Sequence, residues 1–150
     1  MPTREQVEAV ARRSIEAWNR HDATAVGALY ASNARFRESG MPENTKLGRD
    51  QIAEYSAQFI AAFADLELKE LSLTVDGDRA VQEWRASGSH TGGLAGMPAS
   101  GRTITVLGCA VWRFGDDGLI LDEIQYLDRL GLLADLGALE GTPLAAMAGG

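Results

Sequence analysis

Residues 87–102 read SGSHTGGLAGMPASGR, a glycine-rich stretch that holds one of the two histidines in a chain of 150 residues. Sequences typical of β-strands lie on either side, over residues 79–90 and 102–114. Each strand needs a partner to bury its apolar face, which argues against a flexible linker. A phosphate-binding glycine loop would lead directly into a helix, whereas a strand follows here. We therefore predict a wide hairpin at one end of an antiparallel sheet.

The chain before residue 65 is mainly helical in pattern. Residues 4–19 follow a T-x-x-Q capping box and carry apolar side chains at helical spacing. Asp22 is placed to cap a short second helix, and a third helix is expected over residues 49–63. Residues 31–48 predict a short strand around residues 34–37, followed by a loop.

After Asp65 the apolar period changes to two. Alternating leucines over residues 66–75 predict a strand, with a slip that suggests a bulge. Residues 119–128 predict the last strand, and a short amphipathic helix then ends at Gly137. Helices followed by a meander of long strands are typical of an α+β fold.

We therefore predict one domain in which a curved antiparallel sheet wraps around the N-terminal helices. The resulting cone, an α+β barrel, encloses an internal pocket. Its core covers about residues 5–137, and residues 138–150 form a loosely ordered tail.

Composition limits the partners and cofactors. A formal net charge of -7 argues against nucleic acid or an anionic membrane as a partner. There is no apolar run of the roughly 20 residues that span a bilayer, and the N-terminal residues lack the apolar segment of a signal peptide, so we expect a cytoplasmic protein. The histidines are far apart, Cys109 is the only cysteine, and no dinucleotide fingerprint occurs, so we expect neither a metal nor an organic cofactor.

The glycine-rich segment resembles a known family. Gly88-Ser89-His90-Thr91-Gly92, followed by Gly96-x-Pro98-x-x-Gly101-Arg102, is similar to a segment of the SnoaL-like polyketide cyclases, which have the nuclear transport factor 2-like fold. Ser89 stands where Thr is commoner in the family. The resemblance covers roughly residues 5–137. Further similar segments are Trp18–Asp22, Leu29-Tyr30, Leu47–Arg49, Phe63–Leu66, Arg113-Phe114, Gly118–Ile120, Tyr126–Leu133 and Leu136-Gly137.

The resemblance implies a catalytic acid/base aspartate near the end of the last strand, where Tyr126-Leu127-Asp128 matches. By simple alternation, Asp128 shares a strand face with Asp122, Ile124 and Tyr126. Enclosed by apolar side chains, its carboxylate would be desolvated and could both accept and donate a proton. The alternative is that Asp128 caps the closing helix or pairs with Arg129.

His90 is the second catalytic candidate, because it could hydrogen-bond a substrate carbonyl or orient Asp128. Alternatively, it caps its strand and bonds the backbone of the hairpin. Several aromatic side chains are expected to face the pocket, as core packing or as walls for a flat apolar ligand, with Trp84, Trp112 and Tyr55 the first choices as walls. The full set is Trp18, Tyr30, Tyr55, Phe59, Trp84, Trp112 and Tyr126.

Together with these residues, the resemblance implies a cofactor-independent cyclase that closes a ring, by intramolecular aldol chemistry, in an aromatic polyketide or a similar small, apolar, polycyclic substrate. The alternatives are an accessory hydroxylase, isomerase or epoxide hydrolase of the same fold, or a non-catalytic binder of small molecules. The outer face of the sheet mixes apolar and charged side chains, which predicts a homodimer or larger homo-oligomer through this face. Its residues include Val81, Glu83, Arg85 and Leu107.

Overall fold

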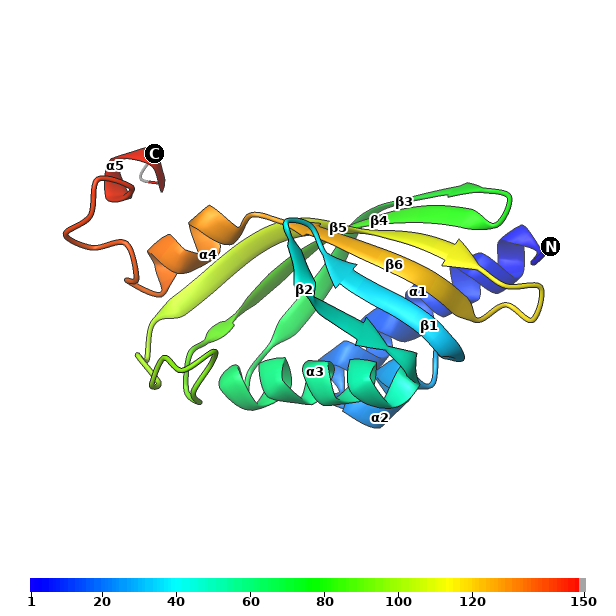
Figure 1. Ribbon diagram of the computed structural model, residues 1–150, viewed down its shortest axis with the longest axis horizontal. Helices are drawn as coiled ribbons and strands as arrows, with labels where there is room; N and C mark the ends of the chain where they lie inside the picture. Colours follow the sequence, from blue (N-terminus) through cyan, green and yellow to red (C-terminus); the bar gives the residue numbers. More distant parts are fainter. Residues whose placement is uncertain (149–150) are drawn as a thin grey trace.

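The computed structural model describes residues 1–148, in which three helices lie against one face of a curved six-stranded sheet (Figure 1). The elements are α1 (Arg4–Asn19), α2 (Ala23–Gly27), β1 (Tyr30–Glu38), β2 (Met41–Leu47), α3 (Gly48–Ala62), β3 (Glu67–Asp76), β4 (Arg79–Ser89), β5 (Thr103–Phe114), β6 (Ile120–Leu127), α4 (Arg129–Asp135) and α5 (Ala145–Ala148). The strand order is β2-β1-β6-β5-β4-β3, with β1 and β6 parallel and all other neighbours antiparallel.

This arrangement confirms the α+β class and the sheet that curves around N-terminal helices. The sheet stays open, with β2 and β3 as its edges, and does not close into a barrel.

The first two helices begin where their capping residues predict. The Thr3 hydroxyl accepts a hydrogen bond from the Gln6 amide, and the Gln6 side chain accepts one from the Thr3 amide, which completes the capping box. Asp22 caps α2 by accepting a hydrogen bond from the Ala25 amide at 3.0 Å. Local side-chain chemistry therefore sets where both helices start.

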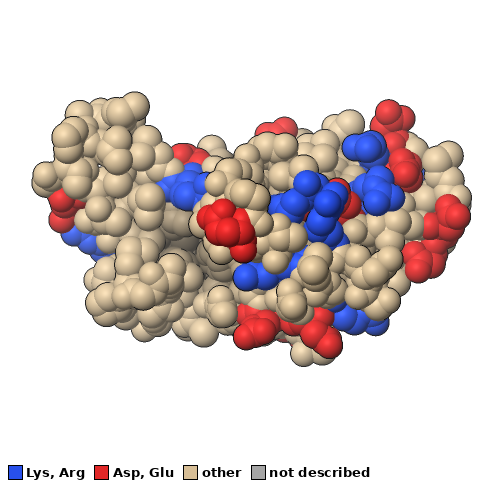
Figure 2. All heavy atoms as spheres, viewed as in Figure 1, with Lys and Arg blue, Asp and Glu red and all other residues tan. Residues whose placement is uncertain are grey.

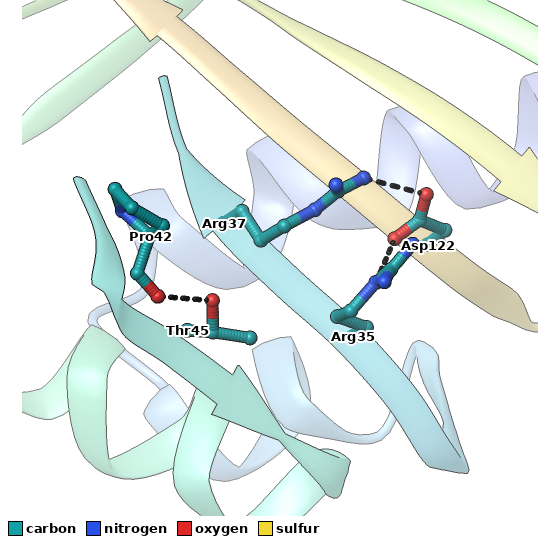
Figure 3. Close-up of polar contacts among 5 residues, drawn as sticks. All are labelled: Arg35, Arg37, Pro42, Thr45 and Asp122. Carbon is teal, nitrogen blue, oxygen red and sulfur yellow. Dashed lines mark hydrogen bonds and ion pairs between the residues drawn. The ribbon is translucent and has the colours of Figure 1, made fainter. Parts of the chain in front are cut away.

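The loop expected within residues 31–48 contains a strand, β2, which forms a hairpin with β1. Its sequence, MPENTKL, lacks alternating apolar residues, because an edge strand with exposed side chains needs none. Pro42 is tolerated at such an edge. The Thr45 hydroxyl donates a hydrogen bond to the Pro42 carbonyl at 2.7 Å (Figure 3).

A bulge at the start of β6 decides which of its side chains face the helices. Phe114 pairs with Ile120 while Trp112 pairs with Glu123, so β6 carries one extra residue. Ile120 and Glu123 are consequently both buried, although they are three residues apart.

The expectation that Tyr126 faces the pocket is therefore wrong, and the strand face that it shares with Asp122 and Ile124 points away from the helices. The bulge moves the inward positions to odd-numbered residues, and Tyr126 is 46% exposed. Asp122 instead pairs with Arg35 at 3.1 Å and Arg37 at 2.9 Å, on the face away from the helices (Figure 3).

The glycine-rich segment forms the predicted wide hairpin between β4 and β5, and it is anchored to α3. The amides of Thr91 and Gly92 both donate to the Ala62 carbonyl at 3.0 Å, which satisfies the end of α3. The carboxylate of Asp65 accepts hydrogen bonds from the Ser89 amide and hydroxyl at 2.7 and 2.9 Å. These bonds hold the pKa of Asp65 below its ordinary value.

The described part of the expected tail makes specific contacts. Leu139 is buried, and Glu140 pairs with Arg102 at 2.7 Å. Residues 149–150 of that tail lie outside the described residues. Within residues 1–148 we find no helix long and apolar enough to cross a membrane, and no group of three or more His, Cys, Asp or Glu residues that could hold a metal ion.

Anchoring of the hairpin depends on glycine at position 92. A Cβ added at Gly92 would lie 2.2 Å from the Ala61 carbonyl oxygen, whereas one at Gly93 would lie an ordinary 3.5 Å from the Met97 carbonyl oxygen. We expect Gly92→Ala to lower the free energy of unfolding by about 2 kcal/mol, as overpacking does, and Gly93→Ala to change it little. Urea denaturation of the two variants measures this, and equal losses would contradict the anchoring role.

Candidate functional site

A pocket lies between the sheet and the helices, with about 870 Å³ of empty space when its open mouth is included. Figure 2 shows the surface hollowed between the region of α4 and that of the hairpin, which Figure 1 locates. Its walls are mainly apolar, which suits a flat hydrophobic ligand. The structure places six of the seven expected aromatic residues in these walls, Tyr126 being the exception: Trp18, Tyr30, Tyr55, Phe59, Trp84 and Trp112. Their contact with a substrate stays a prediction.

The carboxylate of Glu123 lines the pocket from β6 and is 1% exposed. Three side chains donate hydrogen bonds to it: the Tyr30 hydroxyl at 2.6 Å, the Trp112 indole at 2.5 Å and the Gln125 amide at 3.1 Å. Among the described residues that line the pocket there is no Lys, Arg or His. The carboxylate is therefore held by neutral donors alone within this lining.

Burial raises the pKa of Glu123 to about 7, because the charged form loses its solvation. The bonds from Tyr30, Trp112 and Gln125 favour the charged form and oppose this effect only in part. Burial, together with the charge of Glu123, also raises the pKa of Tyr30 well above its ordinary value. Near neutral pH the glutamate can therefore hold or release a proton, while Tyr30 remains a hydroxyl donor.

The two oxygens of Glu123 are not equally occupied. Oε1 accepts the bonds from Trp112 and Gln125, while Oε2 accepts only the bond from Tyr30. Because each carboxylate oxygen has two lone pairs, Oε2 keeps one that no described residue occupies. Oε2 is therefore the oxygen of Glu123 that keeps the capacity to accept one further hydrogen bond.

Trp84 fixes the amide that adjoins Glu123. Its indole N–H donates to Oε1 of Gln125 at 3.1 Å, which turns the Gln125 N–H groups toward the carboxylate. A Cβ at Gly108 would lie 2.4 Å from the Trp84 ring, so only glycine at this position lets the indole lie across β5. One tryptophan thus bonds Glu123 directly and another acts through Gln125.

A second polar group ties together three elements beside the pocket. The Tyr55 hydroxyl on α3 donates to Glu38 on β1, and Arg129 on α4 pairs with the same carboxylate at 2.9 Å. Burial and the charge of Glu38 raise the pKa of Tyr55. The Tyr55 ring lies 4.8 Å from that of Phe36, measured between centroids. These contacts hold the aromatic wall in place.

Asp128 lies outside the residues that line the pocket. Its carboxylate is exposed, and it caps α4 by accepting a hydrogen bond from the Gly131 amide at 2.8 Å. The expected enclosure by apolar side chains is therefore wrong, since β6 ends at Leu127 and the bulge has changed which positions point inward. The capping alternative is what the structure contains. A catalytic role for Asp128 stays a prediction.

His90 is 1% exposed and also lies outside the pocket lining. Its Nδ1 lies 2.9 Å from the Ser100 hydroxyl and accepts a hydrogen bond from the Ser100 amide, and its ring packs against Phe63. These contacts match the alternative in which His90 holds the hairpin. A role in catalysis stays a prediction here too.

Sequence reasoning missed Glu123 and Gln125 as pocket residues, and it did not single out Gln82, although simple alternation puts Gln82 on the same face of β4 as Trp84. The available signal was the register across the turn at 115–118, because an inward-facing Trp112 has to oppose an inward-facing residue of β6. Adjacent acidic residues, Asp122 and Glu123, made either register plausible from the sequence. The bulge decides between them, and it leaves no clear mark in the sequence.

Solved structures resemble this one over nearly its whole length. TsrD from Streptomyces laurentii is 27% identical, with a TM-score of 0.82 and coverage of 93% of this chain and 100% of TsrD. A candidate SnoaL-like polyketide cyclase from Jannaschia sp. CCS1 is 20% identical, with a TM-score of 0.80 and coverage of 92% and 96%. AclR from Streptomyces galilaeus, a candidate hydroxylase, is 20% identical, with a TM-score of 0.79 and coverage of 91% and 99%.

No curated protein matches the sequence significantly. The family model described as SnoaL-like polyketide cyclase, however, matches residues 8–136. This match spans most of α1, all of α2 and α3, the whole sheet and α4, and so includes every residue of the pocket lining. The chain belongs to the SnoaL-like polyketide cyclase family.

Proposed function

We propose that the protein closes a ring by intramolecular aldol addition in a flat aromatic polyketide or similar polycyclic intermediate, without a cofactor. Glu123 acts as general base and then as general acid. The observation that carries the proposal is a buried carboxylate with a pKa of about 7 inside a pocket with aromatic walls. A pKa near the operating pH is what acid/base catalysis needs.

The reaction begins when ionised Glu123 takes a proton through Oε2 from a carbon next to a substrate carbonyl. The resulting enolate carbon attacks a second carbonyl carbon of the same molecule and forms the new carbon–carbon bond. The attacked oxygen becomes an alkoxide, which receives the proton from Glu123. Substrate and product are isomers, so the step needs no oxidant or reductant.

Gln125 supports the enolate. One of its N–H groups donates to Glu123 at 3.1 Å, and no described residue accepts a bond from the other. This second N–H can donate to the oxygen on which negative charge develops. Fixed donors in a water-poor site stabilise such charge strongly. The aromatic walls contribute by holding the two reacting carbons close together.

Two alternatives from the sequence remain relevant. An isomerase would use the same proton transfer without ring closure, and AclR, described as a candidate hydroxylase, shares the fold. A non-catalytic binder would account for the aromatic walls. It would not account for a carboxylate that loses its solvation on burial and has a pKa of about 7.

The first test replaces the acid without changing its shape. Glu123→Gln should lower turnover of a polycyclic diketone substrate by on the order of 10² to 10⁴, the usual value of general acid–base catalysis. Affinity for the substrate should change little, because the aromatic walls supply most of the contact. The matched control is Asp128→Asn, which should keep both turnover and the cap of α4. The opposite result, loss only in the Asp128 variant, would return the role to Asp128.

The second test uses the pH dependence of stability. Glu123 has a folded-state pKa of about 7 against an ordinary 4.5, so the folded protein binds more protons between these values. This contribution to stability is complete below pH 4.5 and is lost as the pH rises to 7, at up to about 1.4 kcal/mol per pH unit.

The measurement is urea denaturation of wild type and Glu123→Gln from pH 5 to pH 8. The wild type should become less stable relative to Glu123→Gln as the pH rises. Over the whole interval between the two pKa values, the difference in the free energy of unfolding should change by on the order of 3 kcal/mol. It should become constant above about pH 7. A difference that is independent of pH would show that Glu123 is ionised throughout.

We further propose a homodimer through the face of the sheet that points away from the pocket. Val81, Leu107 and Tyr126 are exposed on this face, and Leu107 is 52% accessible. Asp122 and its two arginine partners lie on the same face (Figure 3). Apolar side chains beside charged ones are typical of interfaces between subunits.

Light scattering should give about twice the chain mass of 16.0 kDa for the wild type. Leu107→Lys should shift the mass toward the monomer, because a charge would be buried at the interface. Leu144→Lys changes a similarly exposed leucine near the C-terminus and should have no effect. A wild-type mass near 16.0 kDa at micromolar concentration would rule out the dimer.

A further inference from the structure

Gln82 on β4 is a buried amide in the pocket wall that the proposed reaction does not use. It is 2% exposed. Its Nε2 donates hydrogen bonds to the Ala11 carbonyl at 3.2 Å and to the Glu70 carboxylate at 2.8 Å. Both of its N–H groups are therefore committed to neighbouring elements, and the orientation of the amide is fixed.

The carbonyl oxygen of Gln82 is left as a free acceptor. None of the described residues donates a hydrogen bond to Oε1. Within residues 1–148, the side-chain atoms that are both fully enclosed and without a hydrogen-bond partner are Arg37 Nε and His90 Nε2. Oε1 of Gln82 also has no partner in this range but is not one of them, so this oxygen keeps some accessible surface. Since Gln82 lines the pocket, the oxygen borders the cavity, where a ligand can reach it.

The register of the sheet places Gln82 and Glu123 on the same wall of the pocket, on strands β4 and β6. Gln82 pairs with Ala110 and Ala110 pairs with Gln125, so the two amides share one row with a methyl group between them. Glu123 lies at the next inward position of β6. Two strand spacings separate β4 from β6, or about 10 Å, which is comparable to the length of a fused aromatic ring system.

We propose that Gln82 determines specificity by accepting a hydrogen bond from a phenolic hydroxyl on the substrate. The inference rests on the proposed function, in which a flat aromatic molecule fills the pocket. With the hydroxyl at Gln82 Oε1, the far end of the ring system reaches Glu123. Substrates that lack a donor at this position leave a buried acceptor unpaired, which weakens binding.

The test compares three probe molecules of similar shape: naphthol, methoxynaphthalene and naphthalene. Titration calorimetry or ligand-observed NMR measures the dissociation constant of each. Wild type should bind naphthol about tenfold more tightly than methoxynaphthalene, since only naphthol can donate. In Gln82→Met this ratio should fall to about one, with the affinity for naphthalene unchanged.

Ser14→Ala is the control variant that separates Gln82 from another polar group of the pocket, because it removes a hydroxyl that lines the cavity from α1. It should keep the naphthol preference. Loss of the preference in Glu123→Gln, with the preference kept in Gln82→Met, would assign the hydroxyl to Oε2 of the acid and overturn the role of Gln82. Gln82→Met should fold, because both groups that lose a hydrogen bond from Gln82 keep other partners. Glu70 is exposed to water, and the Ala11 carbonyl lies in the interior of α1, where helix hydrogen bonds satisfy it. Thermal unfolding checks this directly.

The outcomes distinguish this inference from the proposed function. If wild type binds none of the three probes, the aromatic pocket itself, and with it the proposed function, is in question. If wild type binds all three equally, or if Gln82→Met keeps the naphthol preference, the role of Gln82 is overturned while the proposed function stands. Loss of the preference in Ser14→Ala alone would assign the recognition of the hydroxyl to Ser14.

Discussion

The site depends on keeping one carboxylate, Glu123, out of water. A buried carboxylate without partners would be strongly destabilising. Here donors from β1, β5 and β6 meet it: Tyr30, Trp112 and Gln125. Each donor in turn depends on the sheet, because β1 has to run parallel to β6 and Trp84 has to cross Gly108 to orient Gln125. The hydrogen bonds that stabilise the buried acid therefore depend on the strand order of the sheet.

Local signals predicted most of the elements. Thr3 and Asp22 set the starts of two helices through bonds to nearby amides, which sequence patterns reveal well. Strand β2 was missed because backbone hydrogen bonds to β1 hold it in the sheet while most of its side chains stay exposed. Its sequence therefore needs no apolar alternation. Hydrophobic periodicity reports burial, and elements that are barely buried leave little trace of their structure.

The site was less predictable than the fold for a related reason. The face presented by β6 depends on a single extra residue near its start, and all residues beyond the bulge change sides. The aromatic residues of β4 and β5 were placed correctly because no bulge interrupts the pairing between these strands. Asp128 was favoured by its position relative to the family pattern, but its side chain serves the first turn of α4. A family motif specifies position along the chain, whereas the role of a side chain depends on the direction it faces.

The two polar groups that the sequence did not reveal share a physical property. Among the described residues, nothing donates a hydrogen bond to the second lone pair of Glu123 Oε2 or to Oε1 of Gln82, although both side chains lie in a mainly apolar wall. Selection for stability alone would replace both with apolar side chains of similar size, because unpaired buried polar atoms lower the free energy of unfolding. Their other atoms, by contrast, are fully engaged in bonds that fix their orientation. A fixed orientation combined with an unused hydrogen-bond acceptor is the arrangement expected of groups that complete their hydrogen bonding with a ligand.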